Sequence, residues 1–278
     1  MTNERALVLG GGGVAGIAWA TGVLAGLADA GVDVTDPDFL LGTSAGSAVA
    51  AQISSGAALG DLFRAQVDPA LQWAELTPRE GALAELFAFG EKVDAEVSDP
   101  VERLRLMGEM ALAAETVSEA ERRAVIEARL PSHDWPERSL SVVAVDAATG
   151  ETRIFDRTSG VGLVDVVTAS CAVPGVWPVA TVGDARYIDG GVRSFTNLDL
   201  AAGYARTLVI APMPDPVLDA DAASIAERGG VIEVITPDEA ALAAFGTDPL
   251  SPASRTPAGH AGFAQGRAVA EAVAALWA

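Results

Sequence analysis

Cysteine is almost absent from this sequence, which has only Cys171 in 278 residues. A single cysteine excludes a disulfide framework within the chain and favours a reducing compartment, so we expect a cytoplasmic protein. Cys171 lies in an apolar run from Val166 to Val173. We therefore expect a small buried residue there rather than a nucleophile.

Positive charge is also scarce, because 18 Lys and Arg residues stand against 38 Asp and Glu residues, giving a formal net charge of -20. Binding to nucleic acid needs a basic surface against the phosphates, and the sequence offers none, so nucleic acid is excluded as a partner. The same balance argues against standing adhesion to an anionic membrane, which leaves at most transient membrane contact.

One long stretch, from Ala6 to Ala28, lacks charged residues altogether. Its length would suit a membrane span or a signal peptide. However, four consecutive glycines, Gly10 to Gly13, interrupt it, and much of the rest is Ala and Gly. We interpret the stretch instead as a buried strand, a glycine turn and a helix.

Aromatic residues make up only 5% of the chain, although 50% of its residues are hydrophobic. The abundant Ala and Gly residues indicate a core built on close helix-to-sheet packing. Short apolar runs alternate with helical patterns, which predicts an α/β fold with a mainly parallel central sheet flanked by helices. The predicted strands are 5–9, 39–41, 139–145, 152–155, 179–182, 186–188, 208–211 and 231–235, with 139–155 as a hairpin; the predicted helices are 14–30, 44–55, 163–172, 217–228 and 259–277, and 247–257 is a predicted loop.

Residues 58–130 differ from the rest of what we expect to be a single domain, 1–278. Charges increase there, glycine becomes rarer, and helical patterns occur at 81–89, 100–114 and 118–130. Ser118 and Glu121 have the spacing of a capping box at the start of the last pattern. We expect a helical cap or insertion over a functional site, with ordinary outer helices as the alternative.

The segment from Gly42 to Gly46, Gly-Thr-Ser-Ala-Gly, has the form Gly-x-Ser-x-Gly. It follows an apolar run and precedes a run of small residues, so it predicts a strand, a sharp turn and a helix. A serine on such a turn has an exposed hydroxyl in front of a helix N-terminus. Ser44 is therefore a candidate nucleophile for acyl transfer.

The glycine run allows two interpretations. Backbone N–H groups of Gly11, Gly12 and Gly13, at a helix N-terminus, can stabilise a developing oxyanion. The same run contains Gly-x-Gly-x-x-Gly, as Gly11, Gly13 and Gly16, the pattern of a dinucleotide-binding oxidoreductase. The acidic residue expected after the second strand of such a fold is missing, and that alternative leaves the serine turn unexplained.

Three residues are candidates for the base that activates Ser44. His133 lies in a predicted surface loop, whereas His260, near the start of the last helix, would complete a Ser-Asp-His triad of the α/β-hydrolase type. Asp189 follows a short predicted strand and precedes Gly190 and Gly191, which let the backbone turn away.

Four segments together resemble the patatin-like phospholipase family. They are Leu9 to Gly13, Gly42 to Ser47, Ala169 to Gly175 with Trp177 to Val179, and Tyr187 to Gly191, in that order. The resemblance implies a Ser44–Asp189 dyad without histidine and an oxyanion hole formed by Gly11, Gly12 and Gly13. It also implies a serine acyl hydrolase acting on lipid or other acyl-ester substrates, with neither cofactor nor metal.

One position departs from the family pattern. Members commonly have Arg or Lys just before the last glycine of the first motif, where this chain has Ala15. The absence of that charge weakens the expectation of a charged phospholipid as substrate. It also leaves open a family member that binds acyl chains without hydrolysing them.

Overall fold

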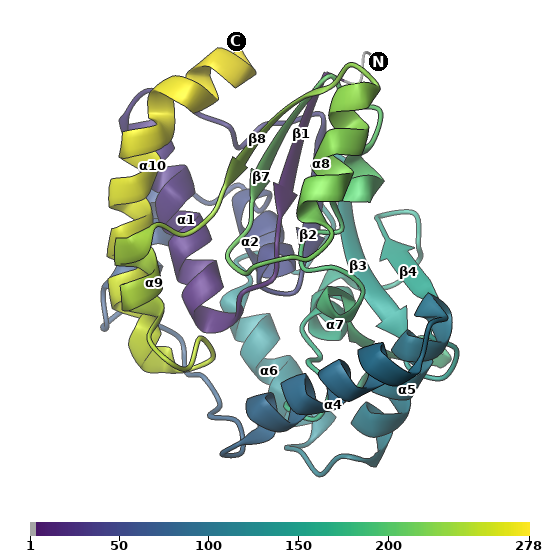
Figure 1. The fold of residues 1–278 in the computed structure, drawn as a ribbon. Helices are drawn as coiled ribbons and strands as arrows, with labels where there is room; N and C mark the ends of the chain where they lie inside the picture. Colours follow the sequence, from purple (N-terminus) through teal and green to yellow (C-terminus); the bar gives the residue numbers. More distant parts are fainter. Residues whose placement is uncertain (1–3) are drawn as a thin grey trace.

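The strands of the structure, a computed structural model that describes residues 4–278, form one eight-stranded sheet (Figure 1). Their order across the sheet is β5-β6-β3-β2-β1-β7-β8, with β4 beside β3. The strands are β1 (Arg5–Leu9), β2 (Phe39–Thr43), β3 (Leu140–Asp146), β4 (Thr152–Phe155), β5 (Ala180–Val182), β6 (Ala185–Asp189), β7 (Arg206–Ile210) and β8 (Val231–Ile235).

The five strands β3, β2, β1, β7 and β8 are parallel. Strands β4 and β6 pair with β3 in the antiparallel sense, and β5 pairs antiparallel with β6 at the edge of the sheet. Strands in such a sheet are near-continuous apolar runs because both faces are buried. Along β1, Leu7 and Leu9 join the core on one face, and Ala6 and Val8 join the core on the other. The predicted α/β fold with a mainly parallel sheet is confirmed, as is the hairpin of β3 and β4.

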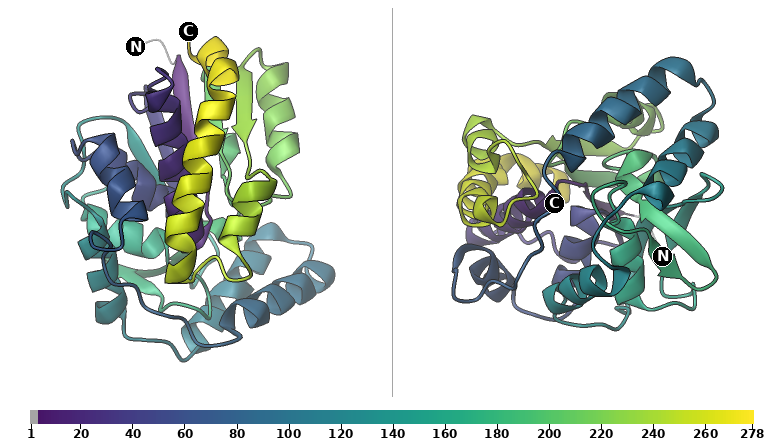
Figure 2. Two further views of the ribbon diagram at one scale, coloured as in Figure 1. Left: turned by 90° about the vertical axis from the view of Figure 1, so that its left-hand side faces the viewer. Right: turned by 90° about the horizontal axis from the view of Figure 1, so that it is seen from below.

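Helices cover both faces of this sheet (Figures 1 and 2). One face is covered by α1 (Gly13–Asp29), α2 (Ala45–Ile53), α7 (Leu163–Ser170), α9 (Glu239–Phe245) and α10 (Arg255–Trp277). The other face is covered by α8 (Leu218–Glu227) and the short turn η2 (Leu198–Ala201). Within residues 4–278, no helix combines the length and apolarity needed to cross a membrane.

Helices α1 and α10 lie side by side with their backbones almost in contact (Figure 2). A Cβ atom at Gly22 or Gly26 of α1 would overlap a backbone carbonyl oxygen of α10. A Cβ atom at Gly262 or Gly266 of α10 would overlap a carbonyl oxygen of α1. Glycine at these positions therefore sets the distance between the two helices.

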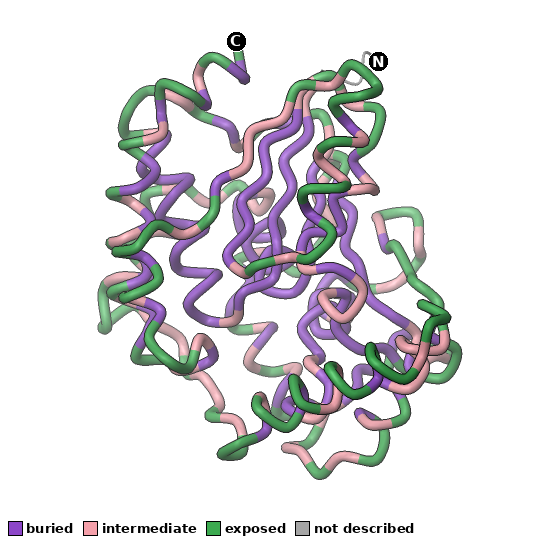
Figure 3. The backbone as a smooth tube through the Cα atoms, viewed as in Figure 1, coloured by how far each residue is buried: buried purple, intermediate pink, exposed green. Residues whose placement is uncertain are grey.

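The segment 58–130, which we call the helical segment, contains α3 (Leu59–Val67), α4 (Ala82–Glu96), α5 (Pro100–Ala113) and α6 (Glu119–Arg129). Helix α3 packs on α1 and α10, and α6 packs on α7. Helices α4 and α5 lie across the lower end of the molecule, with much of their outer surface exposed (Figures 1 and 3). Their inner face packs on the ends of β3 and β6 in a second, smaller core. The predicted capping box at Ser118 and Glu121 is confirmed.

One local prediction is wrong, and one helix was not predicted. The predicted loop 247–257 ends early, since a short turn at Pro252–Ser254 leads directly into α10 at Arg255. Pro257 falls in the first turn of α10, where its missing N–H removes no hydrogen bond. Helix α9 was not predicted; its start is fixed by Asp238, whose carboxylate accepts a hydrogen bond from the Ala241 N–H.

Candidate active site

Ser44 stands on the predicted turn between β2 and α2, with φ of 52° and ψ of -119°. An L-residue rarely adopts a positive φ, so this backbone is strained. The flanking glycines make the turn possible. A Cβ atom at Gly42 would lie 2.6 Å from the Ser47 Cα atom, and one at Gly46 would overlap the Leu9 carbonyl oxygen.

The turn is held in place by the end of α7, a role that the sequence did not reveal. The Ser44 N–H donates to Ser170 Oγ at 2.9 Å, and Ser170 Oγ donates to the Val143 carbonyl at 2.7 Å. The Cys171 thiol donates to the Ser44 carbonyl at 3.2 Å. Cys171 is buried, as predicted, and burial raises the pKa of its thiol, so it supports the turn as a neutral group.

Strand β3 brings Asp189 to Ser44. Thr43, the residue before the serine, pairs with Val143, whereas Asp189, the last residue of β6, pairs with Ala144. The ends of β2 and β6 therefore lie on either side of β3, at successive residues of that strand. The Asp189 N–H also donates to the Ala172 carbonyl at 3.0 Å, which ties the aspartate to the segment that supports the turn.

The Asp189 side chain is buried, with an exposed fraction of 4%. Burial raises the pKa of its carboxyl to about 7, although hydrogen bonding from the Ser44 side chain and the Gly191 N–H and the charge of Arg122 act in the opposite direction. The Gly191 N–H donates to Asp189 Oδ1 at 2.7 Å. Within residues 4–278, Asp189 Oδ2 has no hydrogen-bond partner, so its contact with the Ser44 hydroxyl falls short of full hydrogen-bond geometry.

The three glycines predicted as oxyanion donors are not equivalent. The Gly11 N–H donates to the Phe195 carbonyl at 2.8 Å and is therefore occupied. The N–H groups of Gly12 and Gly13 have no hydrogen-bond partner within residues 4–278. Gly11 contributes space instead, because a Cβ atom there would lie 3.4 Å from the Ser44 Cβ atom.

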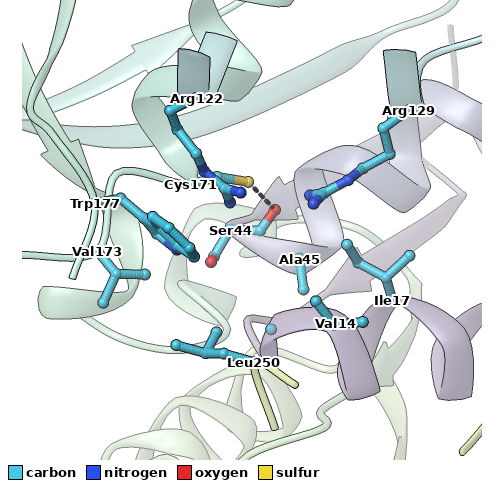
Figure 4. A pocket seen from close by; sticks show the side chains of 11 residues that line it. Val14, Ile17, Ser44, Ala45, Arg122, Arg129, Cys171, Val173, Trp177 and Leu250 are labelled. Atoms are coloured by element: carbon cyan, nitrogen blue, oxygen red, sulfur yellow. Dashed lines mark hydrogen bonds between the residues drawn. The ribbon is translucent and has the colours of Figure 1, made fainter. Parts of the chain in front are cut away.

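A small cavity of about 20 Å³, enough for one water molecule, adjoins Ser44 (Figure 4). Its apolar walls come from the start of α1, the segment after α7 and the loop before α10. Arg122 and Arg129 of α6 close one side and were not predicted as site residues. The lining is Gly13, Val14, Ile17, Ser44, Ala45, Arg122, Arg129, Cys171, Val173, Trp177 and Leu250.

The model of the family described as patatin-like phospholipase matches residues 7–202, more than two thirds of the chain, and so includes every element of this site except the loop at Leu250. The chain belongs to the patatin-like phospholipase family. The activity general to this family is the hydrolysis of lipid acyl esters, and in that general sense the chain is a lipid acyl hydrolase.

Two solved structures resemble this patatin-like chain distantly. VipD from Legionella pneumophila has 14% identity and a TM-score of 0.48, with 97% of this chain and 67% of VipD covered. The type III effector protein ExoU also has 14% identity, with a TM-score of 0.41 and coverage of 97% of this chain and 53% of ExoU. Among curated proteins, none matches the sequence.

The two histidines lie away from the Ser44 cavity. His260 is exposed on α10, where its ring packs edge-on against Phe63 of α3, and it does not line the Ser44 cavity. His133 is half-exposed, with its side chain close to Glu127. Neither position supports the Ser-Asp-His alternative.

The dinucleotide alternative also loses its basis. Strand β2 ends at Thr43 and leads straight into the Ser44 turn, so no acidic residue follows it to bind a ribose hydroxyl. The side of the glycine run on which Cβ atoms would stand is packed against Pro212 and Leu250. A Cβ atom at Gly12 would lie 2.5 Å from the Pro212 Cβ atom, and one at Gly13 would lie 2.8 Å from Leu250 Cδ2. The glycine run therefore has no room for side chains at Gly12 and Gly13.

Ala15, where the family commonly has Arg or Lys, is fully buried in α1, and its N–H donates to the Pro249 carbonyl at 2.9 Å. No positive charge reaches the site from this position. The charge comes instead from α6, because Arg122 and Arg129 both line the cavity (Figure 4). Their spacing with buried Ile126, at positions i, i+4 and i+7, is the signal that could have placed them on the inner face of α6.

Proposed function

We propose that this chain hydrolyses carboxylic esters of lipids through a dyad of Ser44 and Asp189, with Gly12 and Gly13 as oxyanion donors. The observation that carries the proposal is the meeting of β2 and β6 at successive residues of β3, which brings a strained serine and a buried carboxyl together. A carboxyl whose pKa is raised to about 7 is a suitable base at neutral pH.

The proposed reaction has two halves. Asp189 accepts the Ser44 proton as Oγ attacks the ester carbonyl carbon, and the free N–H groups of Gly12 and Gly13 donate to the oxyanion. The carbon–oxygen bond to the alcohol breaks, and the alcohol leaves with the proton from Asp189. A water molecule then gives a proton to Asp189 and attacks the acyl group, which releases the acid and returns the proton to Ser44.

The cavity walls support an acyl group as the part of the substrate that enters. Val14, Ile17, Val173, Trp177 and Leu250 line the cavity with apolar side chains. The cavity holds only about one water molecule, which is less space than an acyl chain needs.

Turnover of a p-nitrophenyl acyl ester tests the dyad. Ser44→Ala and Asp189→Asn should each reduce kcat/KM by roughly 1000-fold or more, since nucleophile and base act as a unit. Fluorophosphonate should label wild-type protein at Ser44. Full activity in either variant would overturn the assignment, and an unlabelled wild-type protein that still binds fatty acid would indicate a non-hydrolytic family member.

His260→Ala is the matched control for these variants. Because His260 is exposed on α10 and does not line the Ser44 cavity, its loss should leave turnover of the same ester unchanged. An almost inactive His260→Ala protein with a wild-type melting temperature would instead favour the Ser-Asp-His triad.

A further inference from the structure

A short loop, residues 193–197, contacts the glycine run, the serine turn and the turn that follows the aspartate. It connects η1 (Gly190–Val192), a short turn directly after Asp189, to η2. The Phe195 carbonyl accepts a hydrogen bond from the Gly11 N–H at 2.8 Å, so the loop is tied to the glycine run. The last residue of the loop contacts the other two parts of the site through one side chain.

That residue, Asn197, is fully buried. Arg193 donates to Asn197 Oδ1 at 2.7 Å, and because a guanidinium group can only donate, the amide nitrogen must face the other partners. Asn197 Nδ2 donates to Thr43 Oγ1 at 3.0 Å and to the Ser194 carbonyl at 2.8 Å. A longer contact, at 3.3 Å, joins the same nitrogen to the Gly190 carbonyl.

The Asn197 amide connects two strands that are not neighbours in the sheet. Strands β2 and β6 lie on opposite sides of β3, so they share no ladder hydrogen bonds within residues 4–278. Thr43 immediately precedes Ser44, and Gly190 immediately follows Asp189. The Asn197 side chain therefore links the proposed nucleophile and base directly, without passing through β3.

The backbone of Asn197 has an uncommon conformation, with φ of 51° and ψ of 38°. Asparagine tolerates this left-handed region better than most residues, but a buried residue stays there only if its surroundings fix it. The Asn197 N–H donates to Ser194 Oγ at 2.7 Å. Asp215 Oδ2 in turn accepts from Ser194 Oγ at 2.7 Å and from the N–H and hydroxyl of Thr196 at 2.8 Å each. These bonds hold the amide in place.

We propose that Asn197 is a positioning residue, which sets the distance and angle between the Ser44 hydroxyl and the Asp189 carboxylate. The proposal rests on the proposed function of that dyad. The contact between the two groups already falls short of full hydrogen-bond geometry. Further displacement of either residue should therefore lower kcat, since a shift of about 1 Å in a reacting group can lower a rate roughly 100-fold.

Two variants remove the connection to different extents. Asn197→Gly keeps the left-handed backbone accessible and removes the amide. Its kcat for a p-nitrophenyl acyl ester should fall roughly 10- to 100-fold, with little change in KM. Thr43→Val removes one acceptor and keeps the shape of the side chain. Its kcat should fall less, about 2- to 10-fold, as expected for the loss of one neutral hydrogen bond.

Thr207→Val is the matched control for Thr43→Val. Thr207 is also fully buried, on β7 of the same sheet. Its hydroxyl has no hydrogen-bond partner within residues 4–278, so the same substitution there removes no connection. The kcat of Thr207→Val should equal that of wild type.

Two further measurements distinguish positioning from a merely structural role. In the double variant, Thr43→Val should cause almost no further loss of kcat, because Asn197→Gly has already removed the shared hydrogen bond. The second measurement is the pH profile of kcat/KM. Hydrogen bonding from Ser44 lowers the pKa of Asp189, so a weaker contact should move the acidic limb to higher pH. Protein that is only less stable would lose active fraction without moving that limb.

The outcomes separate this proposal from the proposed hydrolysis. If wild-type protein is active and a folded Asn197→Gly protein keeps the wild-type kcat and pH profile, the positioning role is wrong and the dyad stands. Independent, multiplicative effects in the double variant would lead to the same conclusion. If Asn197→Gly does not fold, equal kcat values in Thr43→Val and Thr207→Val would refute the role. Wild-type protein that neither hydrolyses the ester nor reacts with fluorophosphonate at Ser44 would refute both proposals.

Discussion

Two regions of the molecule line the same cavity with different chemical groups. They are the sheet region, residues 5–55 and 139–211, and the helical segment, residues 58–130. The sheet region supplies backbone groups, a hydroxyl and a carboxyl whose positions follow from strand register and tight turns. The helical segment supplies two guanidinium groups on long side chains from α6. Geometry that comes from the backbone leaves specific motifs in the sequence, whereas the two arginines of α6 leave only a helical spacing.

The buried cluster of Arg122, Arg129 and Arg255 around Glu75, here called the arginine cluster, offers the largest expected effect on this contrast. Glu75→Gln removes the carboxylate that Arg129 and Arg255 contact, leaving buried positive charge without compensation. The free energy of unfolding should fall by roughly 3–5 kcal/mol, measured by urea denaturation.

The control for this change is Glu85→Gln, also in the helical segment, where an exposed carboxylate pairs with Arg79. Exposed pairs contribute little, so the urea midpoint should stay near that of wild type. Equal effects of the two variants on the urea midpoint would show that the buried cluster contributes no more to stability than an exposed ion pair.

The glycine loop of the sheet region gives the next largest effect. In Gly12→Ala the new Cβ atom would lie 2.5 Å from the Pro212 Cβ atom and 2.9 Å from the Gly16 Cα atom, so the loop must shift and displace its free N–H groups. We expect kcat to fall roughly 100- to 1000-fold, the usual effect of losing an oxyanion donor.

Gly60→Ala is the matched control, because a Cβ atom there has nothing within 4 Å and Gly60 lies in α3. Ester turnover and circular dichroism are measured for both variants. Wild-type turnover in Gly12→Ala would exclude this loop as the oxyanion hole.

The base of the sheet region gives a graded effect with pH. In the proposed dyad, Asp189 must be ionised to accept the Ser44 proton, and the pKa of its carboxyl is raised to about 7. Between pH 5 and 7, kcat/KM should therefore rise about tenfold per pH unit and then level off above pH 7. A profile that is flat through this range would exclude Asp189 as the base.

The same shift has a consequence for stability. A raised folded-state pKa means that the protonated carboxyl stabilises the fold most at pH below about 3.9, and that this contribution is lost as the pH rises to about 7. Asp189→Asn cannot titrate there. Its stability relative to wild type, measured by urea denaturation, should therefore increase as the pH is raised through that range.

Much of the sheet region could be predicted from the sequence, because its signals are local. The strands were found within one or two residues, and Ser44 lies on the expected turn. The occupied Gly11 N–H could not be predicted, since its acceptor, the Phe195 carbonyl, is distant in sequence and is positioned only by the tertiary fold. The supporting role of Ser170 is hidden for the same reason.

The helical segment was predicted less completely. The cap of α6 is a local pattern and was recognised at Ser118. By contrast, whether Arg122 points to solvent or into a cavity depends on what packs against α6. Outside the helical segment, helix α9 is short and was missed, and α10 begins earlier than expected because proline is tolerated in a first turn.

The glycine contact between α1 and α10 has a consequence for biosynthesis. The free N–H groups of Gly12 and Gly13 belong to the start of α1, and α1 is covered along its glycine face by residues 259–266 of α10. A nascent chain that ends between Asp189 and Gly259 contains Ser44 and Asp189 but lacks the residues that cover that face. Helix α1, which carries the proposed oxyanion donors, can therefore be covered only late in synthesis, after the proposed nucleophile and base have been added.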